Sequence, residues 1–203
     1  GTESFDYTVE QFADLQLLRY KVPGFDELSL QQKKLVYYLS EAALHGRDIL
    51  FDQNGKYNLT IRKMLETVYT DYSGNRSDAD FVNLEIYLKR VWFSNGIHHH
   101  YAADKFVPGF SSEFFRKALQ SVDVNKLPLS EGQTLDELCD EVFPIIFNPE
   151  VMSKRVNQSD GEDLVLTSAS NYYRGVTQAE AEEFYNRMKN PNDSMPVMFG
   201  MNS

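Results

Sequence analysis

The side chains most able to do chemistry in this chain are its histidines, three of which are consecutive. His98, His99 and His100 form one run, and His45 stands apart from it. A hydrolytic zinc site needs three protein ligands that converge on the ion and leave one position open. Adjacent residues point in different directions in a helix or a strand, so this run cannot supply three ligands to one ion. We therefore predict that the chain has no metal site and no catalytic residue of its own.

Motifs for other hydrolytic or phosphate-binding chemistry are missing from the sequence. It contains no H-E-x-x-H or H-E-x-x-x-H pair, no G-x-S-x-G nucleophile motif and no G-x-x-x-x-G-K-[ST] loop. The single cysteine, Cys139, has acidic neighbours that disfavour a thiolate, so we interpret it as a small core residue. Glu180, Glu182 and Glu183 are expected on a solvated helix face, without the burial that raises the pKa of a general acid.

Charge and composition exclude several classes of partner. The 203 residues carry a formal net charge of -10, which disfavours binding to nucleic acid and to anionic membranes. No apolar run approaches the ~20 residues that span a bilayer. The sequence begins at Gly1 without a methionine, which is typical of a trimmed chain. The compartment is therefore left open: the cytoplasm, or the cell envelope or periplasm if a signal peptide preceded Gly1.

Helix signals dominate the chain. Capping boxes of the S/T-x-x-E/Q type predict helix starts at Thr8, Ser29, Thr134 and Thr177. Apolar side chains at helical spacing predict three further helices. These stripes comprise Ile61, Leu65, Val68 and Tyr72; Phe81, Leu84, Leu88, Val91 and Trp92; and Phe115, Ala118, Leu119 and Val122.

Helix stops, strand signals and polar stretches complete the expected fold. Gly46 is predicted to end the helix after Ser29, and Pro144 to kink or end the helix after Thr134. Short extended segments are expected at 163–167 and 196–200, and a sub-boundary at the polar stretch 153–163. Together the pattern predicts a mainly α chain, an irregular domain of six to eight helices with at most a few short strands, over residues 1–203.

The segment 87–110, YLKRVWFSNGIHHHYAADKFVPGF, holds the only tryptophan, the histidine run and a helix-stop signal at Asn95 and Gly96. One interpretation is structural: a helix ends at Asn95, and aromatic side chains pack beneath a loop. The other is functional: the loop edges a peptide-binding cleft, with Asn95, Gly96, His99 and Tyr101 as candidate contacts.

Within this segment, V-W-F-S-N-G-I-H-H-H-Y followed by D-K-F-V-P resembles the bacterial branch of the dipeptidyl peptidase III family of zinc exopeptidases. Three further stretches are similar to it: F-D-Y-T-V-E-Q-F-A-D-L-Q-L-L-R-Y-K-V-P-G-F, G-R-D-I-L-F-D-Q-N-G-K-Y-N-L-T-I-R and the terminal P-V-M-F-G-M-N-S. The likeness runs along essentially the whole chain, but no motif in it carries chemistry.

The resemblance implies a two-lobed enzyme that releases dipeptides from the N-terminus of short peptides. In that family one lobe binds zinc through an H-E-x-x-x-H helix and a downstream Glu, and nothing in this sequence matches those ligands. Residues 1–203 would then be the N-terminal helical region of the non-zinc lobe, a scaffold and cleft wall. Zinc would belong to the parent enzyme and not to this chain. The expected partners are short peptides and the remainder of the same polypeptide.

Two alternatives remain from the sequence. The chain could be a stand-alone helical module that binds peptides or proteins without enzymatic activity. It could also be a divergent helical hydrolase that uses His98, His99 and His100.

Overall fold

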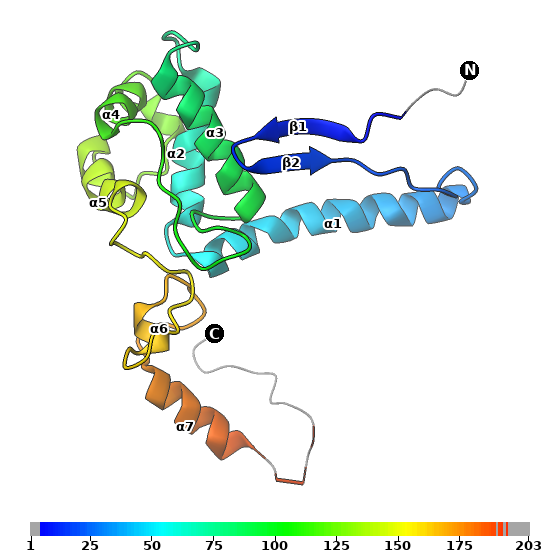
Figure 1. The fold of residues 1–203 in the computed structure, drawn as a ribbon, viewed down its shortest axis with the longest axis vertical. Helices are drawn as coiled ribbons and strands as arrows, with labels where there is room; N and C mark the ends of the chain where they lie inside the picture. The colour runs from blue at the N-terminus through cyan, green and yellow to red at the C-terminus, as the bar shows by residue number, and fades with distance from the viewer. Residues whose placement is uncertain (1–4, 190, 193, 195–203) are drawn as a thin grey trace. The chain divides into compact units, whose positions relative to one another are not determined.

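The computed structural model describes residues 5–189, 191, 192 and 194, and it confirms the mainly α fold (Figure 1). Seven α-helices and one two-stranded antiparallel sheet lie within these residues. The elements, in order, are β1 (Thr8–Phe12), β2 (Leu15–Leu18), α1 (Leu30–Asn54), α2 (Asn58–Asp71), α3 (Ala79–Ser94), α4 (Ser112–Gln120), a 3-10 turn (Val124–Lys126), α5 (Leu135–Phe147), α6 (Leu164–Thr167) and α7 (Gln178–Met188).

The chain divides into two compact units, the first ending at Ile49 and the second beginning at Leu50. The division falls inside α1, so the last turns of this helix belong to the second unit. The polar stretch 153–163 lies within the second unit. A sub-boundary there stays a prediction.

The first unit contains a β-hairpin where the sequence suggested a helix start. β1 and β2 pair with Phe12 opposite Leu15, so Ala13 and Asp14 form the turn, and Ala13 takes a left-handed φ of 48°. The hydroxyl of Thr8 accepts a hydrogen bond from Gln16 across the hairpin. The capping-box prediction at Thr8 is therefore wrong. The motif is short, and the β-branched residues that open this segment favour a strand.

Helix α1 begins as predicted and ends later than predicted. The Ser29 hydroxyl accepts from the Gln32 N–H, and the Gln32 side chain accepts from the Ser29 N–H, which confirms this capping box. The predicted stop at Gly46 is wrong, because α1 continues to Asn54. A glycine ends a helix by taking a left-handed conformation, and Gly46 does not take one.

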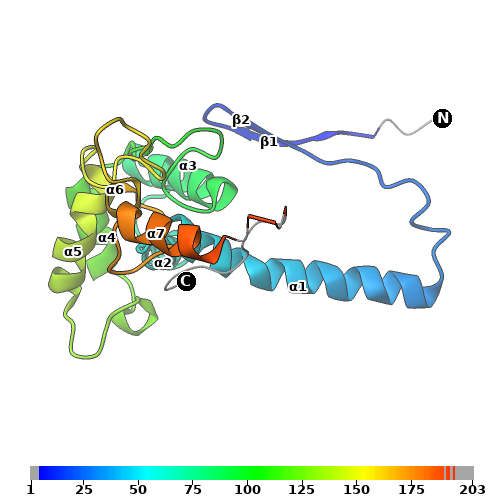
Figure 2. The same cartoon turned by 90° about the horizontal axis from the view of Figure 1, so that it is seen from below.

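The core of the second unit lies among α2, α3, α4 and α5, which pack as a helical cluster (Figures 1 and 2). The apolar stripes predicted for the first three of these helices face the core, with most of their members buried and Tyr72, Trp92 and Val122 partly buried against it. The fully buried side chains include Ile61, Leu65, Val68, Phe81, Leu84, Leu88, Val91, Phe115, Ala118 and Leu119. Each stripe recurs every three or four residues, which places it on one face of its helix.

Helix α5 continues through its proline. Its Thr134–Glu137 capping box forms as predicted, but Pro144 does not end the helix, which runs to Phe147. A proline inside a helix removes the hydrogen bond to the carbonyl of residue i−4, here Asp140. Ile145 and Ile146 are buried just beyond Pro144, and this burial holds the last turn in place.

The segment 163–167 is helical, so the predicted strand is wrong. The Asp163 carboxylate accepts from the N–H groups of Val165 and Leu166, which caps α6, and from the N–H of Gln178 in α7. This cap outweighs the strand propensity of the Leu-Val-Leu-Thr run. The Thr177 capping box is confirmed, and Glu180, Glu182 and Glu183 are exposed as predicted. The extended segment predicted at 196–200 lies outside the described residues.

Candidate functional site

The candidate loop begins where α3 ends. Asn95 is the C-cap residue and lies in the left-handed region at φ 52°, ψ 39°, a conformation that asparagine tolerates better than most residues. The N–H groups of Asn95 and Gly96 both donate to the carbonyl of Val91. The chain therefore turns out of α3 at Asn95 and Gly96, where the sequence predicted the end of a helix.

A buried asparagine holds the start of this loop. The Asn58 side chain donates to the carbonyl of Phe51 at 3.0 Å and fills the space beside two glycines. A Cβ atom on Gly96 would lie 2.4 Å from Nδ2 of Asn58, and one on Gly55 would lie 2.9 Å from it. Gly96 also has a φ of 152°. The loop can approach the α1–α2 junction this closely only because both positions are glycine.

Beyond Gly96 three extended segments run side by side. His98 pairs with Lys105, and Asp104 pairs with Lys154, as isolated antiparallel bridges. The backbone hydrogen bonds between the segments join Phe106 to Ile97, His99 to Asp104, Lys105 to Ser153 and Arg155 to Ala103. The middle segment, residues 103–106, thus joins the start of the loop on one side to the segment that follows α5 on the other, through isolated bridges and not through regular strands.

Lys105 fixes the far side of the loop. Its ammonium donates to the backbone carbonyls of Ile145 at 2.8 Å, Asn148 at 2.5 Å and Val151. Two of these carbonyls belong to the C-terminal end of α5, where a cation also opposes the negative end of the helix dipole. Burial lowers the pKa of Lys105 to about 8, so the side chain is still mostly charged at neutral pH.

His98 helps to hold these hydrogen-bonded segments together. Its Nε2 lies 2.8 Å from the carbonyl oxygen of Met152, so this nitrogen carries the proton and donates it. Nδ1 has no hydrogen-bond partner among the described residues. Burial lowers the pKa of His98 to about 4, and the ring is therefore neutral at physiological pH.

The other two histidines project with aromatic rings at the tip of the loop. The His99 ring lies 5.2 Å from Tyr101 and 5.4 Å from Phe106, centroid to centroid. The His100 ring lies 4.7 Å from Phe93 and 4.8 Å from Tyr101. Tyr101 is 64% exposed. We call His99, His100, Tyr101 and Phe93 the ring cluster; its polar and aromatic faces suit contact with a peptide.

The four candidate residues fall into two groups. His99 and Tyr101 are brought together in the ring cluster. Asn95 and Gly96 lie at the start of the loop, where Asn54 donates to the Asn95 carbonyl at 3.2 Å. Sequence reasoning did not find Asn58 and Lys105, which hold the loop. The glycines at 55 and 96 were the sequence feature that could have pointed to Asn58. No feature pointed to a buried role for Lys105, because a lysine is normally a surface residue.

The three consecutive histidines have three different environments, as expected for adjacent residues. Within the described part of the chain, no group of three His, Cys, Asp or Glu side chains could hold a metal ion. Cys139 is fully buried, as predicted, and burial raises the pKa of its thiol.

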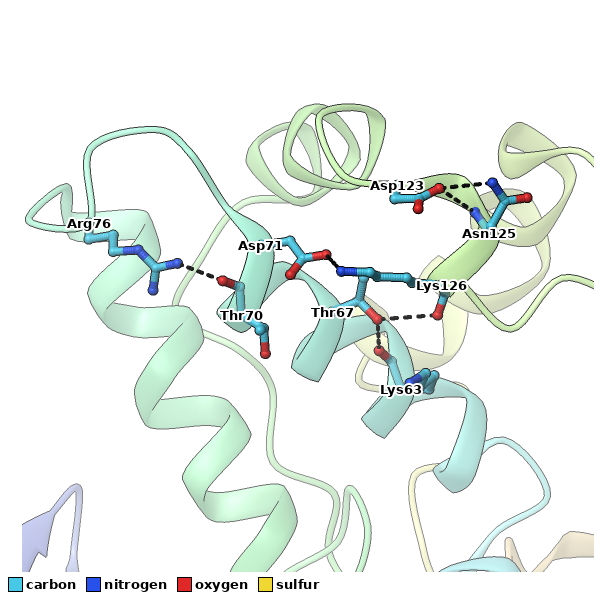
Figure 3. A network of polar contacts seen from close by, with 8 residues as sticks. All are labelled: Lys63, Thr67, Thr70, Asp71, Arg76, Asp123, Asn125 and Lys126. Atoms are coloured by element: carbon cyan, nitrogen blue, oxygen red, sulfur yellow. Dashed lines mark hydrogen bonds and ion pairs between the residues drawn. The ribbon is translucent and has the colours of Figure 1, made fainter.

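A second polar network lies at the C-terminal end of α2 and has a structural explanation (Figure 3). The Arg76 guanidinium donates to the backbone carbonyls of Tyr69, Thr70 and Tyr72, which are the last acceptors of that helix. Lys126 binds Asp71 at 2.7 Å, and this pairing raises the pKa of the lysine. These cations cap a helix and join it to the turn after α4, so we do not assign the network a ligand.

The fold and the loop together define a mainly helical chain with a hydrogen-bonded loop that carries the ring cluster, in which Tyr101 is largely exposed. A search of protein-family models finds no match to this chain, and neither does a search of curated proteins. Among the described residues, no helix is both long enough and apolar enough to cross a membrane.

Proposed function

We propose that this chain is the N-terminal, non-catalytic part of a zinc-dependent dipeptidyl peptidase that removes dipeptides from the N-terminus of short peptides. Its role would be that of scaffold and cleft wall. The observation that carries the proposal is the sequence likeness centred on V-W-F-S-N-G-I-H-H-H-Y and D-K-F-V-P. Zinc and its ligands would belong to the rest of the parent protein.

The geometry of the loop supports this role. Its backbone is fixed by Asn58 and Lys105, while Tyr101 stays largely exposed. A binding surface gains affinity when its contact residues are ordered before the ligand arrives, because less conformational entropy is lost on binding. The ring cluster would contact the peptide, and the metal elsewhere in the parent enzyme would activate water for attack on the scissile carbonyl.

Activity measurements test the proposal directly. The chain and its full-length parent would be assayed side by side on a dipeptidyl-arylamide, with and without a chelator. We expect chelator-sensitive hydrolysis by the parent and none by the 203-residue chain. Turnover by the chain alone would contradict the proposal, as would a parent protein that is inactive and free of zinc. A downstream coding sequence with H-E-x-x-x-H would support it.

The candidate contact at Asn95 needs a matched pair of variants in the full-length parent. Asn95→Ala removes the amide and also disfavours the left-handed backbone, whereas Asn95→Gly removes only the amide. If the amide contacts peptide, both variants should raise KM more than they lower kcat. A rise in KM for Asn95→Ala alone would mean that the residue acts only by shaping the loop.

One observation favours the alternative of a stand-alone binding module. Helix α1 carries large apolar side chains that are well exposed, among them Leu35 at 59%, Leu39 at 60% and Ile49 at 59%. Exposed apolar stripes of this kind often mark protein contacts. If this alternative holds, the coding sequence would lack a zinc motif and the purified parent would hydrolyse no peptide.

A further inference from the structure

His98 joins the three extended segments beneath the ring cluster. It lies on the first segment, is only 2% exposed, and pairs with Lys105 on the middle segment. Its Nε2 donates to the carbonyl of Met152, at the start of the segment that follows α5. A change in the charge of this one ring therefore bears on all three segments.

Among the described residues, the charged groups that act on His98 are two cations and one carboxylate. The cations are Lys105, on the middle segment, and Arg155, on the segment that follows α5. The carboxylate is Asp104, which is 59% exposed and already paired with Lys154. Water screens an exposed and paired charge more than a buried one, so the surroundings of the ring disfavour a further positive charge.

The closed loop therefore disfavours a proton on Nδ1 of His98. This nitrogen has no partner among the described residues, so its N–H would be buried without an acceptor. Burial is the main cause of the pKa of about 4; the bond to Met152 opposes it, and the charges of Lys105 and Arg155 add to it. A ring released into water has a pKa of about 6.5. Between these two values a released ring binds the proton and a closed one does not, so acid favours the open loop.

The contacts on either side of the loop confine such an opening to residues 98–104. Ile97 and Phe106 flank this segment, and both are buried members of the core. Asn58 packs against the start of the loop, and Lys105 donates to carbonyls at the end of α5. None of these contacts involves the His98 ring, so they can persist when that ring leaves its site.

We propose that segment 98–104 is an acid-sensitive element, which a proton on His98 releases from the segment that follows α5 while the helical core stays folded. His99, His100 and Tyr101 lie on this segment, so most of the ring cluster would move with it. Loss of peptide contacts in acid is a consequence that rests on the proposed function. The opening itself does not depend on the peptidase assignment.

Amide hydrogen exchange, measured by NMR on the 203-residue chain, detects the opening without any assay of activity. The reporters are the N–H of His99, which donates to Asp104, and the N–H of Arg155, which donates to Ala103. Protection is expressed relative to an unfolded peptide at the same pH, which removes the direct effect of pH on exchange. From about pH 7 to about pH 5 the protection of both reporters should fall at least about tenfold.

Amides in the middle of α3 separate local opening from global unfolding. At about pH 5 they should be at least about tenfold more protected than the two reporters. Low concentrations of urea should speed exchange in α3 and leave the reporters unchanged, because a local opening exposes little surface. Equal protection and equal urea dependence of the two sets would show that the loop opens only when the whole unit unfolds, and would overturn the proposal.

His98→Gln identifies the titrating group, because glutamine can still donate to Met152 but takes up no proton in this range. The reporters should then keep their protection from about pH 7 to about pH 5. His100→Gln, on the exposed tip of the same segment, is the matched control and should keep the fall seen in the wild type. A wild-type fall in His98→Gln would refute the role of His98, and if that variant does not fold, the wild-type comparison with α3 still decides whether the opening is local.

Discussion

At the scale of single residues, the functional candidates are held by two polar side chains, the buried Asn58 and the half-buried Lys105. Asn58 is almost fully buried and uses its amide on the Phe51 carbonyl, while Lys105 gathers three backbone carbonyls at the end of α5. Each compensates for its burial by hydrogen bonding, since an unpaired buried polar group costs several kcal/mol. These contacts fix the backbone from which the ring cluster projects.

His98 should make stability fall in acid. Its pKa is about 4 in the folded protein and near 6.5 in an unfolded chain, so the unfolded state binds the proton more readily between these values. The contribution of His98 to the free energy of unfolding is largest above about pH 6.5, where the ring is neutral in both states. It decreases as the pH falls towards 4, by roughly 3 kcal/mol at most. Urea unfolding at several pH values measures this slope.

His98→Gln keeps a donor for the Met152 carbonyl but cannot take up a proton in this range, so its slope should be shallower. His100→Gln, at the exposed tip, is the control and should keep the wild-type slope. A wild-type slope in His98→Gln would show that other groups cause the acid sensitivity.

Lys105→Met should destabilise the protein by about 2–3 kcal/mol at neutral pH, because three carbonyls lose one charged donor. Lys154→Met removes an exposed lysine that pairs with Asp104, and its cost should stay below about 1 kcal/mol. Chemical denaturation of the two variants gives the comparison. Equal losses would mean that the Lys105 contacts add little to stability.

At the scale of elements, glycines have opposite roles that the sequence does not distinguish. Gly46 lies inside α1 with nothing within 4 Å of a Cβ built on it. Gly96 lies in a loop packed closely against Asn58, where the same atom would meet Nδ2 at 2.4 Å. Both glycines were predicted to mark helix ends, but only Gly96 lies near one, directly after Asn95, the C-cap residue of α3.

These two glycines predict opposite effects of one substitution. Gly46→Ala should stabilise the protein by ~0.5–1 kcal/mol, because alanine lowers the entropy cost of the helix. Gly96→Ala should destabilise it by ~2 kcal/mol or more, through the clash with Asn58 and the positive φ. Thermal unfolding of both variants tests the pair. A destabilised Gly46→Ala would indicate that α1 packs against a partner at this position.

At the scale of the whole molecule, the two units differ in how much apolar surface they bury. The second unit has a continuous core from Phe51 to Ile146. In the first, Phe12 is the buried apolar side chain among the described residues, and many others along β1, β2 and α1 are exposed. A two-stranded hairpin with so little burial is marginally stable by itself.

Hydrogen exchange should therefore divide the chain at residues 49 and 50. Amides of β1 and β2 should exchange at least about tenfold faster than those of α2 and α3, whose inward faces are fully buried. Mass spectrometry of the native chain measures both sets in one experiment. Uniform protection across the two units would mean that the first unit is covered in solution, by a second copy or by another surface.

The sequence by itself determined the helical class, most helix starts and the buried stripes of α2, α3 and α4. Capping boxes and 3.6-residue periodicity depend on neighbours along the chain, so they can be read locally. That the three adjacent histidines do not share one metal ion stays a prediction from the directions of neighbouring side chains. The strand predicted at 163–167 failed, because the Asp163 cap joins two helices that are separated in sequence.

Only the tertiary structure decided which polar residues hold the candidate loop. Asn58 meets Gly96, and Lys105 meets the end of α5, across 38 and more residues of chain. The helix at Pro144 continues because Ile145 and Ile146 are buried by residues distant in sequence. Such contacts depend on packing between elements, and a local pattern contains no information about which surfaces will meet.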